Sequence, residues 1–332
     1  MNRMHKRVLL TAGCCAAMLA GGCGPGGGLL IRPVSAKQDL KETVVSKDPG
    51  WPVWDKIVII DVDGLLMNDR EEGLFGSREN PVGLFVEKLQ KAQGDGRVRA
   101  VILRINSPGG GVTAADIMYQ RLLQFHRQKQ VPVVAVFEDV AASGAYYLAC
   151  GADEIMAHPT TLTGSIGVIV QTISLAGTLQ KIGAEAEAVV SGPYKDMASP
   201  LESLNEEDRR ILQSIVDDYY RRFLQVVDDG RPKLDAAKVQ ALADGRVYTA
   251  DQALANGLVD RLGTMNDAID RAKALSGYKQ VKVVIYHRPL GYRGSVYAGP
   301  PAPMQVNLLN ITAPDLAYLA RPQFMYLWTG RE

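Results

Sequence analysis

One serine and one lysine in this chain could supply a nucleophile and its base. Ser143 lies in the segment Ala-Ala-Ser-Gly-Ala-Tyr-Tyr, directly after an apolar run typical of a β-strand. Lys195 follows 52 positions later (195 − 143), in the loop-like stretch Ser-Gly-Pro-Tyr-Lys-Asp. A serine hydroxyl becomes nucleophilic when a base removes its proton. A lysine amine can be that base where desolvation keeps it neutral. The pair therefore indicates acyl transfer without a histidine.

A glycine-rich turn could stabilise negative charge on a reacting carbonyl. The run Asn-Ser-Pro-Gly-Gly-Gly, residues 106–111, closes another apolar strand and precedes a helical pattern. Glycines allow a substrate carbonyl to approach the backbone closely, and N–H groups near a helix N-terminus can bind an oxyanion. The alternatives are a tight strand-to-helix turn or a phosphate loop, but the spacing of known phosphate and dinucleotide loops is absent.

The histidines offer no base of comparable promise. His5 lies in the N-terminal segment, His126 lies beside a charged run, and His287 lies near the C-terminal tail. The fourth, His158, follows Ser143 by 15 positions (158 − 143) and stays open as an alternative partner. Taken alone, Ser143 could also be a helix N-cap, and Lys195 could be an ordinary loop lysine with its amine in water.

Strands and helices alternate through the middle of the chain. This pattern predicts an α/β fold with parallel strands and crossover helices. The predicted strands are residues 56–62, 98–105, 131–137, 154–157, 166–173, 186–190 and 281–286, and the predicted helices are residues 81–91, 114–127, 144–150, 175–182, 205–227, 235–243 and 249–256.

The N-terminus predicts a lipoprotein-type signal peptide over residues 1–22. Basic residues precede an apolar segment, residues 8–20, that is too short to span a bilayer comfortably. Small residues then lead to Cys23 in Leu-Ala-Gly-Gly-Cys, which resembles a bacterial lipoprotein box. We expect lipid on Cys23 to hold the protein at the bacterial cell membrane, on the extracytoplasmic side. Ordinary signal cleavage and an uncleaved anchor are the alternatives.

Composition divides the rest of the chain into three parts. Residues 23–50 are rich in Gly, Pro, Ser and Lys, which predicts a flexible tether. Residues 51–288 are predicted to form the folded domain. Residues 289–332 form a tail rich in Pro and aromatic residues. The apolar run 324–328 is expected to cover its own core, to pack on a neighbouring subunit, or to lie along a substrate groove as a strand. Contact with a membrane interface is a further alternative. The formal net charge of +1 and the lack of a basic patch argue against a nucleic-acid partner.

Six short motifs together resemble the signal peptide peptidase A family, serine–lysine peptidases of bacteria whose fold is related to Clp protease and crotonase. In chain order they are Asp-Val-Asp-Gly (61–64), Asn-Ser-Pro-Gly-Gly (106–110), Ala-Ser-Gly-Ala-Tyr-Tyr (142–147), Thr-Gly-Ser-Ile-Gly-Val (163–168), Tyr-Lys-Asp-Met (194–197) and Gly-Leu-Val-Asp (257–260). The resemblance covers roughly residues 55–275 and departs at Ala198, where the family has glycine.

The resemblance implies a Clp protease/crotonase-like α/β fold and a serine endopeptidase without metal or cofactor. Ser143 would be the nucleophile and Lys195 the general base, while the backbone N–H groups of Gly109 and Gly110 would bind the oxyanion. Ser165 would orient the lysine amine. The implied substrates are apolar peptides such as released signal peptides. The implied assembly is a homo-oligomeric ring in which serine and lysine meet across a subunit interface.

Two other functions are compatible with the same fold. One is an acyl-CoA enzyme of the crotonase type, which uses similar backbone oxyanion donors. The secretory signal argues against it, because CoA is cytosolic. The other is a non-catalytic lipoprotein scaffold.

Overall fold

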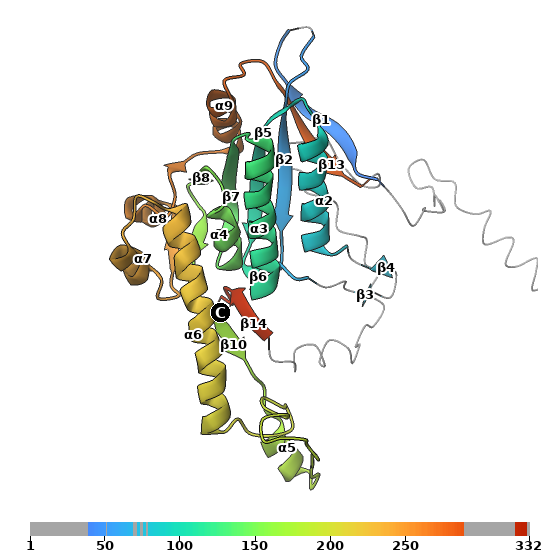
Figure 1. Ribbon diagram of the computed structural model, residues 1–332, viewed down its shortest axis with the longest axis vertical. Coiled ribbons are helices and arrows are strands. Elements are labelled where there is room, and N and C mark those ends of the chain that lie inside the picture. The colour runs from blue at the N-terminus through green and yellow to red at the C-terminus, as the bar shows by residue number, and fades with distance from the viewer. Residues whose placement is uncertain are drawn as a thin grey trace, which may run out of the picture. The chain divides into compact units, whose positions relative to one another are not determined.

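A mostly parallel β-sheet carries the core of the protein (Figure 1). The computed structural model describes residues 39–50, 52–68, 79–288 and 323–330, and the backbone of residues 72–73 and 76–77. The strands of the main sheet are β1 (Lys41–Lys47), β2 (Lys56–Asp63), β5 (Val98–Ser107), β7 (Val133–Ala142), β8 (Glu154–Ala157), β9 (Leu162–Gly164), β11 (Val247–Thr249), β12 (Arg261–Leu262) and β13 (Lys282–His287). They run in the order β1-β13-β2-β5-β7-β8-β12, and β9 joins β7 to β11. Only β1 and β11 pair antiparallel in this sheet as described.

Helices connect these strands and cover both faces of the sheet. They are α2 (Pro81–Gly94), α3 (Val112–Lys129), α4 (Gly144–Ala149), α5 (Ala176–Lys181), α6 (Glu206–Gly230), α7 (Ala236–Leu242), α8 (Ala250–Asn256) and α9 (Met265–Ser276). Helices α2, α3 and α4 contribute to the core on one face, and α9 to a separate core on the other. The predicted α/β class with parallel strands and crossover helices is confirmed.

The central strands are buried on both faces. In β2, Val58 and Ile60 lie in the core with α2 and α3, whereas Ile57 and Ile59 lie in the core with α9. All four side chains are 0% exposed. A strand covered by helices on both sides needs apolar residues at every position rather than at alternate ones. This explains why the strand appears in the sequence as an unbroken β-branched run.

Two smaller sheets complete the described structure. One has the order β10-β14-β6 and consists of β10 (Ile169–Gln171), β14 (Gln323–Leu327) and β6 (Gly109–Gly111). The other pairs β3 (Glu72–Gly73) with β4 (Gly76–Ser77). The first of these sheets joins the glycine turn, which forms β6, to the predicted tail, which supplies β14.

The folded part begins earlier than the predicted boundary at residue 51. Residues 41–47, assigned to the tether by sequence, form β1 and pair antiparallel with β13. Glu42 on this strand also accepts a hydrogen bond from Lys56 at 2.6 Å. The segment is a polar edge strand with few buried side chains, so its sequence carries no apolar alternation that could have revealed it. The predicted signal peptide and Cys23 lie outside the described residues.

Other predicted elements differ in extent. Residues 186–190, predicted as a strand from their composition, form no regular structure, and Val189 is fully exposed. The predicted strand 166–173 shrinks to β10, and helix α9 was not predicted. Within the described ranges, none of the helices combines the length and apolar character needed to cross a bilayer.

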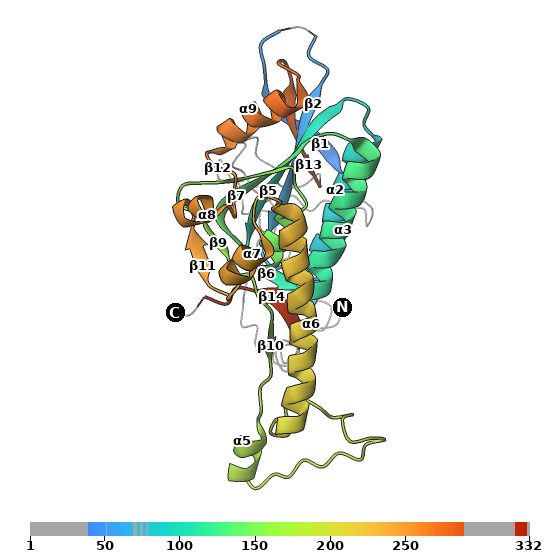
Figure 2. The ribbon, with the colours of Figure 1, turned by 60° about the vertical axis from the view of Figure 1, so that its left-hand side comes forward.

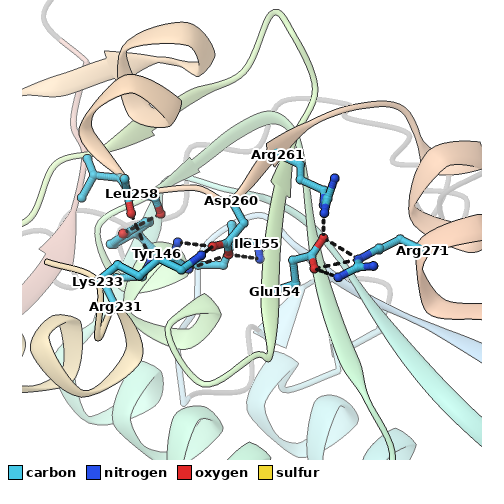
Figure 3. Close-up of polar contacts among 10 residues, drawn as sticks. Tyr146, Glu154, Ile155, Arg231, Lys233, Leu258, Asp260, Arg261 and Arg271 are labelled. Carbon is cyan, nitrogen blue, oxygen red and sulfur yellow. Dashed lines mark hydrogen bonds and ion pairs between the residues drawn. The ribbon is translucent and has the colours of Figure 1, made fainter. Parts of the chain in front are cut away.

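A largely buried ion pair lies near α4, the helix that follows the candidate serine (Figure 3). Arg231 donates two hydrogen bonds to Asp260, at 2.8 and 2.7 Å, and Asp260 also accepts from the backbone N–H of Ile155. Close by, the Tyr146 hydroxyl on α4 donates to the Leu258 carbonyl at 2.8 Å. The Gly-Leu-Val-Asp motif therefore joins the end of α6, strand β8 and helix α4.

Replacing Asp260 with asparagine should lower the free energy of unfolding at pH 7 by about 3 kcal/mol, because Arg231 would stay buried without its full counter-charge. Burial opposes ionisation, but hydrogen bonds from Arg231 and Ile155 hold the pKa of Asp260 below its ordinary value of 3.8. A carboxylate with a lowered pKa stabilises the fold above that ordinary value, and its contribution is lost as pH falls through the folded-state pKa.

Urea titrations of wild type and Asp260→Asn at pH 7 and at about pH 3 measure this effect. The difference between the two proteins should shrink at the lower pH. The control is Asp270→Asn, because the Asp270 side chain is 78% exposed and lies 3.7 Å from Lys273. An equal loss at both pH values would show that shape, rather than charge, makes Asp260 important.

Candidate active site

Strand β7 delivers Ser143 to the N-terminus of α4. Ser143 has φ 52° and ψ −115°, an unfavourable conformation for a residue with a side chain. Its N–H donates to the Gly164 carbonyl at 2.8 Å, which holds this turn in place. The side chain makes no cap hydrogen bond to α4, and its buried Oγ has no hydrogen-bond partner among the described residues. Ser143 therefore occupies the N-cap position of α4 without capping the helix through its side chain, and its hydroxyl has no described partner.

The glycine turn lies directly against this serine. A Cβ placed on Gly109, which has φ 101°, would lie 2.7 Å from the backbone nitrogen of Gly144. A Cβ on Gly110 would lie 2.1 Å from the Leu66 carbonyl oxygen. Any side chain at these two positions would collide with backbone atoms that cannot easily move. The sequence needs glycine here so that β6 can approach the N-terminus of α4.

The backbone donors of the site differ in part from those predicted. The Gly109 N–H already donates to Ser107 Oγ at 3.1 Å. The Gly144 nitrogen begins α4, where an N–H has no intrahelical acceptor. This geometry favours Gly110 and Gly144, rather than Gly109 and Gly110, as the pair that faces an oxyanion. Sequence reasoning missed Gly144, although the residue after a nucleophile at a strand-to-helix turn is a recurrent donor.

The tail strand β14 lies in this site, between β6 and β10 (Figures 1 and 2). It pairs antiparallel with both, so that Tyr326 lies opposite Gly110 and Met325 opposite Ile169. The Trp328 N–H donates to the Pro108 carbonyl at 2.9 Å. Among the places expected for the apolar run, the structure shows it as a strand paired with the glycine turn of its own chain.

The Tyr326 carbonyl lies at the candidate oxyanion donors. Its oxygen is 2.1 Å from the position that a Cβ on Gly109 would occupy, and 3.1 Å from the corresponding position on Gly144. The carbonyl of Tyr326 therefore lies beside Gly109 and Gly144.

Ser165 lies close to Ser143 but on a different segment. It directly follows β9, whose last residue, Gly164, pairs with Ala142 and accepts from the Ser143 N–H. Ser165 has φ 49° and is 7% exposed. Its own N–H donates to the backbone carbonyl of Arg246 at 2.8 Å. The structure thus brings the two serines and the glycine turn together.

Lys195 is not brought to Ser143 within the chain. It belongs to the arm, defined here as residues 172–205, which projects from β10 and the N-terminal half of α6 (Figure 2). Lys195 is exposed, and no described residue pairs with its amine. His158 is exposed, its Nδ1 lies 2.9 Å from Thr160 Oγ1, and it makes no hydrogen bond to Ser143 Oγ. Among the described residues, no basic side chain therefore makes a hydrogen bond to Ser143 Oγ.

Comparison with known proteins places the chain in a family. The sequence model of peptidase family S49 matches residues 126–279. A protein of Enterococcus faecium that carries the name signal peptide peptidase SppA is 37% identical over 283 residues, covering 83% of this chain and 81% of that protein. Protease 4 of Haemophilus influenzae is 34% identical over 226 residues, covering 68% of this chain and 35% of that protein. The chloroplast serine protease SPPA of Arabidopsis thaliana is 34% identical over 208 residues, covering 61% of this chain and 30% of that protein.

The match to the Enterococcus protein extends over most of both chains, and the family match contains both Ser143 and Lys195. The family match also agrees with the predicted Clp protease/crotonase-like fold, and it favours a protease over an acyl-CoA enzyme. The chain belongs to peptidase family S49, as a serine protease of the signal peptide peptidase A type.

Proposed function

We propose that the protein is a membrane-tethered serine endopeptidase in which Ser143 of one chain is activated by Lys195 of a neighbouring chain. The observation that supports this most is the Ser143 hydroxyl, which makes no hydrogen bond among the described residues and lies in a strained turn at the N-terminus of α4. A hydroxyl in this setting needs only a base to become a nucleophile.

The arm supplies the second argument, because its apolar side chains are uncovered in a single chain. Helix α5 has no buried residue. The exposed apolar residues of the arm are Ile173, Leu175, Ile182, Val189, Val190, Tyr194 and Leu201. An exposed apolar group of this kind marks an interaction site. A second copy of the chain that covers the arm would also bring Lys195 to a serine, and repetition of that head-to-tail contact closes a ring.

In the proposed reaction, neutral Lys195 takes the proton of Ser143 as Oγ attacks the peptide carbonyl. The oxyanion accepts hydrogen bonds from the N–H groups of Gly110 and Gly144, at the positive end of α4. Protonated Lys195 then gives its proton to the leaving amine. A water molecule, deprotonated by the same lysine, hydrolyses the serine ester. Ser165 would orient the amine.

The proposed substrates are apolar peptides in extended form, such as released signal peptides. β14 supports this choice, since it shows that an extended segment can add as a strand between β6 and β10. The tether is proposed from sequence alone: lipid on Cys23 would hold the enzyme at the bacterial cell membrane, on the extracytoplasmic side.

A fluorophosphonate probe applied to membranes that contain the protein tests this function. We expect covalent labelling of Ser143 and loss of hydrolysis of a fluorogenic apolar peptide. Mass spectrometry of the same extract should find lipid on Cys23. Absence of labelling in folded protein would favour the non-catalytic scaffold. An unmodified Cys23 within an intact N-terminus would reject the lipid anchor and leave the peptidase proposal standing.

A further inference from the structure

We infer that Ser107 is a positioning residue for catalysis, because its hydroxyl holds the glycine turn in the shape that aims the Gly110 N–H at the oxyanion. The inference rests on the proposed function, in which Ser143 attacks a peptide carbonyl and Gly110 is one of two oxyanion donors. Ser107 is the last residue of β5 and is 0% exposed. It acts through the turn rather than on the substrate.

The Ser107 hydroxyl joins two backbone groups that together fix the direction of its proton. Its Oγ donates to the Gly64 carbonyl at 2.6 Å and accepts from the Gly109 N–H at 3.1 Å. A carbonyl can only accept and an N–H can only donate, so the hydroxyl satisfies both partners in one orientation. Acceptance from the N–H two residues ahead is the contact of a serine turn. Pro108, which lies between them, has no N–H to compete for this oxygen.

Backbone contacts fasten the other side of Gly109 to the segment that follows β2. The Leu66 N–H donates to the Gly109 carbonyl, and the Gly111 N–H donates to the Leu66 carbonyl, both at 2.9 Å. The Gly109 carbonyl and the Gly110 N–H belong to one planar peptide group, in which they point in opposite directions. With the carbonyl held by Leu66, the Gly110 N–H must therefore point away from this segment.

Gly109 is the flexible point of this arrangement. Its φ of 101° lies in a region that glycine enters and leaves at little steric cost. The bond to Ser107 holds the peptide group before Gly109, and the bond from Leu66 holds the peptide group after it. Among these contacts, Ser107 Oγ is the only side-chain atom. A single substitution at Ser107 can therefore release the turn without changing the backbone itself.

Asn106 ties the same stretch of chain to β7 on the opposite side. Strands β5 and β7 fall out of register at this point. There the Asn106 side chain accepts a hydrogen bond from the Val140 N–H at 3.2 Å and donates one to Asp139 at 3.1 Å. Ser107 reaches the other neighbour, the turn that follows β2. The two side chains before Pro108 thus hold the glycine turn from both sides, which gives a physical reason for the order Asn-Ser-Pro before the glycines.

Ser107→Ala is expected to lower kcat by about 10- to 100-fold, because a donor that is poorly aimed still stabilises the oxyanion in part. Outright removal of an oxyanion donor costs about 10²–10³-fold in kcat. KM should change by less than about two-fold, since strand pairing binds the peptide before negative charge develops. Hydrolysis of a fluorogenic apolar peptide by the full chain measures both constants. Ser107→Cys, whose thiol forms only weak hydrogen bonds, should give an intermediate kcat.

An apolar tripeptide aldehyde tests whether the loss belongs to the transition state. Ser143 Oγ adds to the aldehyde carbon, the serine proton passes to the base, and the former carbonyl oxygen becomes the anion that the donors bind. The matched peptide alcohol cannot form this adduct. In Ser107→Ala the inhibition constant of the aldehyde should rise by about 10- to 100-fold, while that of the alcohol stays within about two-fold. Equal losses for both inhibitors would indicate general damage to the groove and would overturn the inference.

Thr161→Val is the matched control for loss of a buried hydroxyl. Thr161 is 1% exposed, and its hydroxyl also donates to backbone carbonyls, those of Phe137 and Glu138. These partners lie on β7 rather than on the glycine turn. The control should lower the melting temperature about as much as Ser107→Ala does, and it should keep kcat within about two-fold of wild type. A loss of kcat as large as that of Ser107→Ala would show that any buried hydroxyl here matters equally, against the inference.

The remaining outcomes separate this inference from the proposed function. An active wild type with unchanged kcat in folded Ser107→Ala would overturn the inference and leave the peptidase standing. Where the alanine variant does not fold, Ser107→Cys decides in the same way, and wild-type kcat in that variant counts against the inference. A wild type that neither hydrolyses peptides nor reacts with a fluorophosphonate would reject the proposed function and the inference together.

Discussion

Replacement of Ser143 by alanine is expected to abolish peptide hydrolysis and to leave the fold intact. The Oγ atom makes no hydrogen bond in the described structure, so its removal breaks no stabilising contact. Alanine experiences the same backbone strain at φ 52° as serine does. Loss of a nucleophile lowers kcat by at least about 10⁴-fold in serine peptidases, because the remaining donors give only modest catalysis. Hydrolysis of a fluorogenic apolar peptide and thermal melting measure the two effects.

Ser214→Ala is a suitable control for this experiment. Ser214 is exposed on α6, and its hydroxyl donates only to the carbonyl of Ile211 in the same helix. Its replacement should change neither activity nor stability appreciably. Turnover near the wild-type rate in Ser143→Ala would assign the nucleophile to another residue, and Ser165 would be the first to examine because it lies beside the same turn.

The centre of the fold could be predicted because its signal is local. Strands β2, β5, β7 and β8 each contain a short apolar run, and the helices between them have clear periodicity. The structure extends β7 to Ala142, beyond the predicted end at residue 137. The added residues begin with Glu138 and Asp139, and β9 pairs with the last three of them, residues 140–142. Tertiary pairing therefore decides strand ends that composition leaves open.

The elements that the sequence did not reveal depend on distant partners. β6, β10 and β14 contain only three to five residues each, too few for a periodic pattern. They form a sheet because segments far apart in the chain meet at the glycine turn. Residues 186–190 show the converse: they have strand-like composition, but no strand in the described part of the chain pairs with them.

The candidate site, like the fold, could be predicted in part from the sequence. Motif resemblance identified Ser143, Ser165 and the glycine turn, and the structure places all three together. Resemblance could not show that the Gly109 N–H is occupied by Ser107 or that Gly144 is available. Those facts follow from three-dimensional packing. The position of the base cannot be read from one chain, because the arm that carries Lys195 has no partner there.

Lys195→Ala is expected to lower kcat about as severely as Ser143→Ala, by at least about 10⁴-fold, since groups that act as a unit fail together. Lys195 is exposed and no described residue pairs with its amine, so the variant should melt like wild type. Lys279→Ala is the control, because Lys279 is equally exposed but lies just before β13, away from the arm. This control should keep full activity.

Mixing the two inactive variants reveals where the pair forms. If Ser143 and Lys195 meet across an interface, chains with Ser143→Ala and chains with Lys195→Ala each supply what the other lacks. Refolding or co-expressing them in equal amounts should restore about a quarter of the wild-type activity, because half of the serines are intact and half of their neighbours carry the lysine. Activity that stays at the level of the separate variants, in mixtures shown by native mass spectrometry to contain both chains, would mean that each chain builds its own dyad. The arm would then have to fold back onto its own serine in the active state.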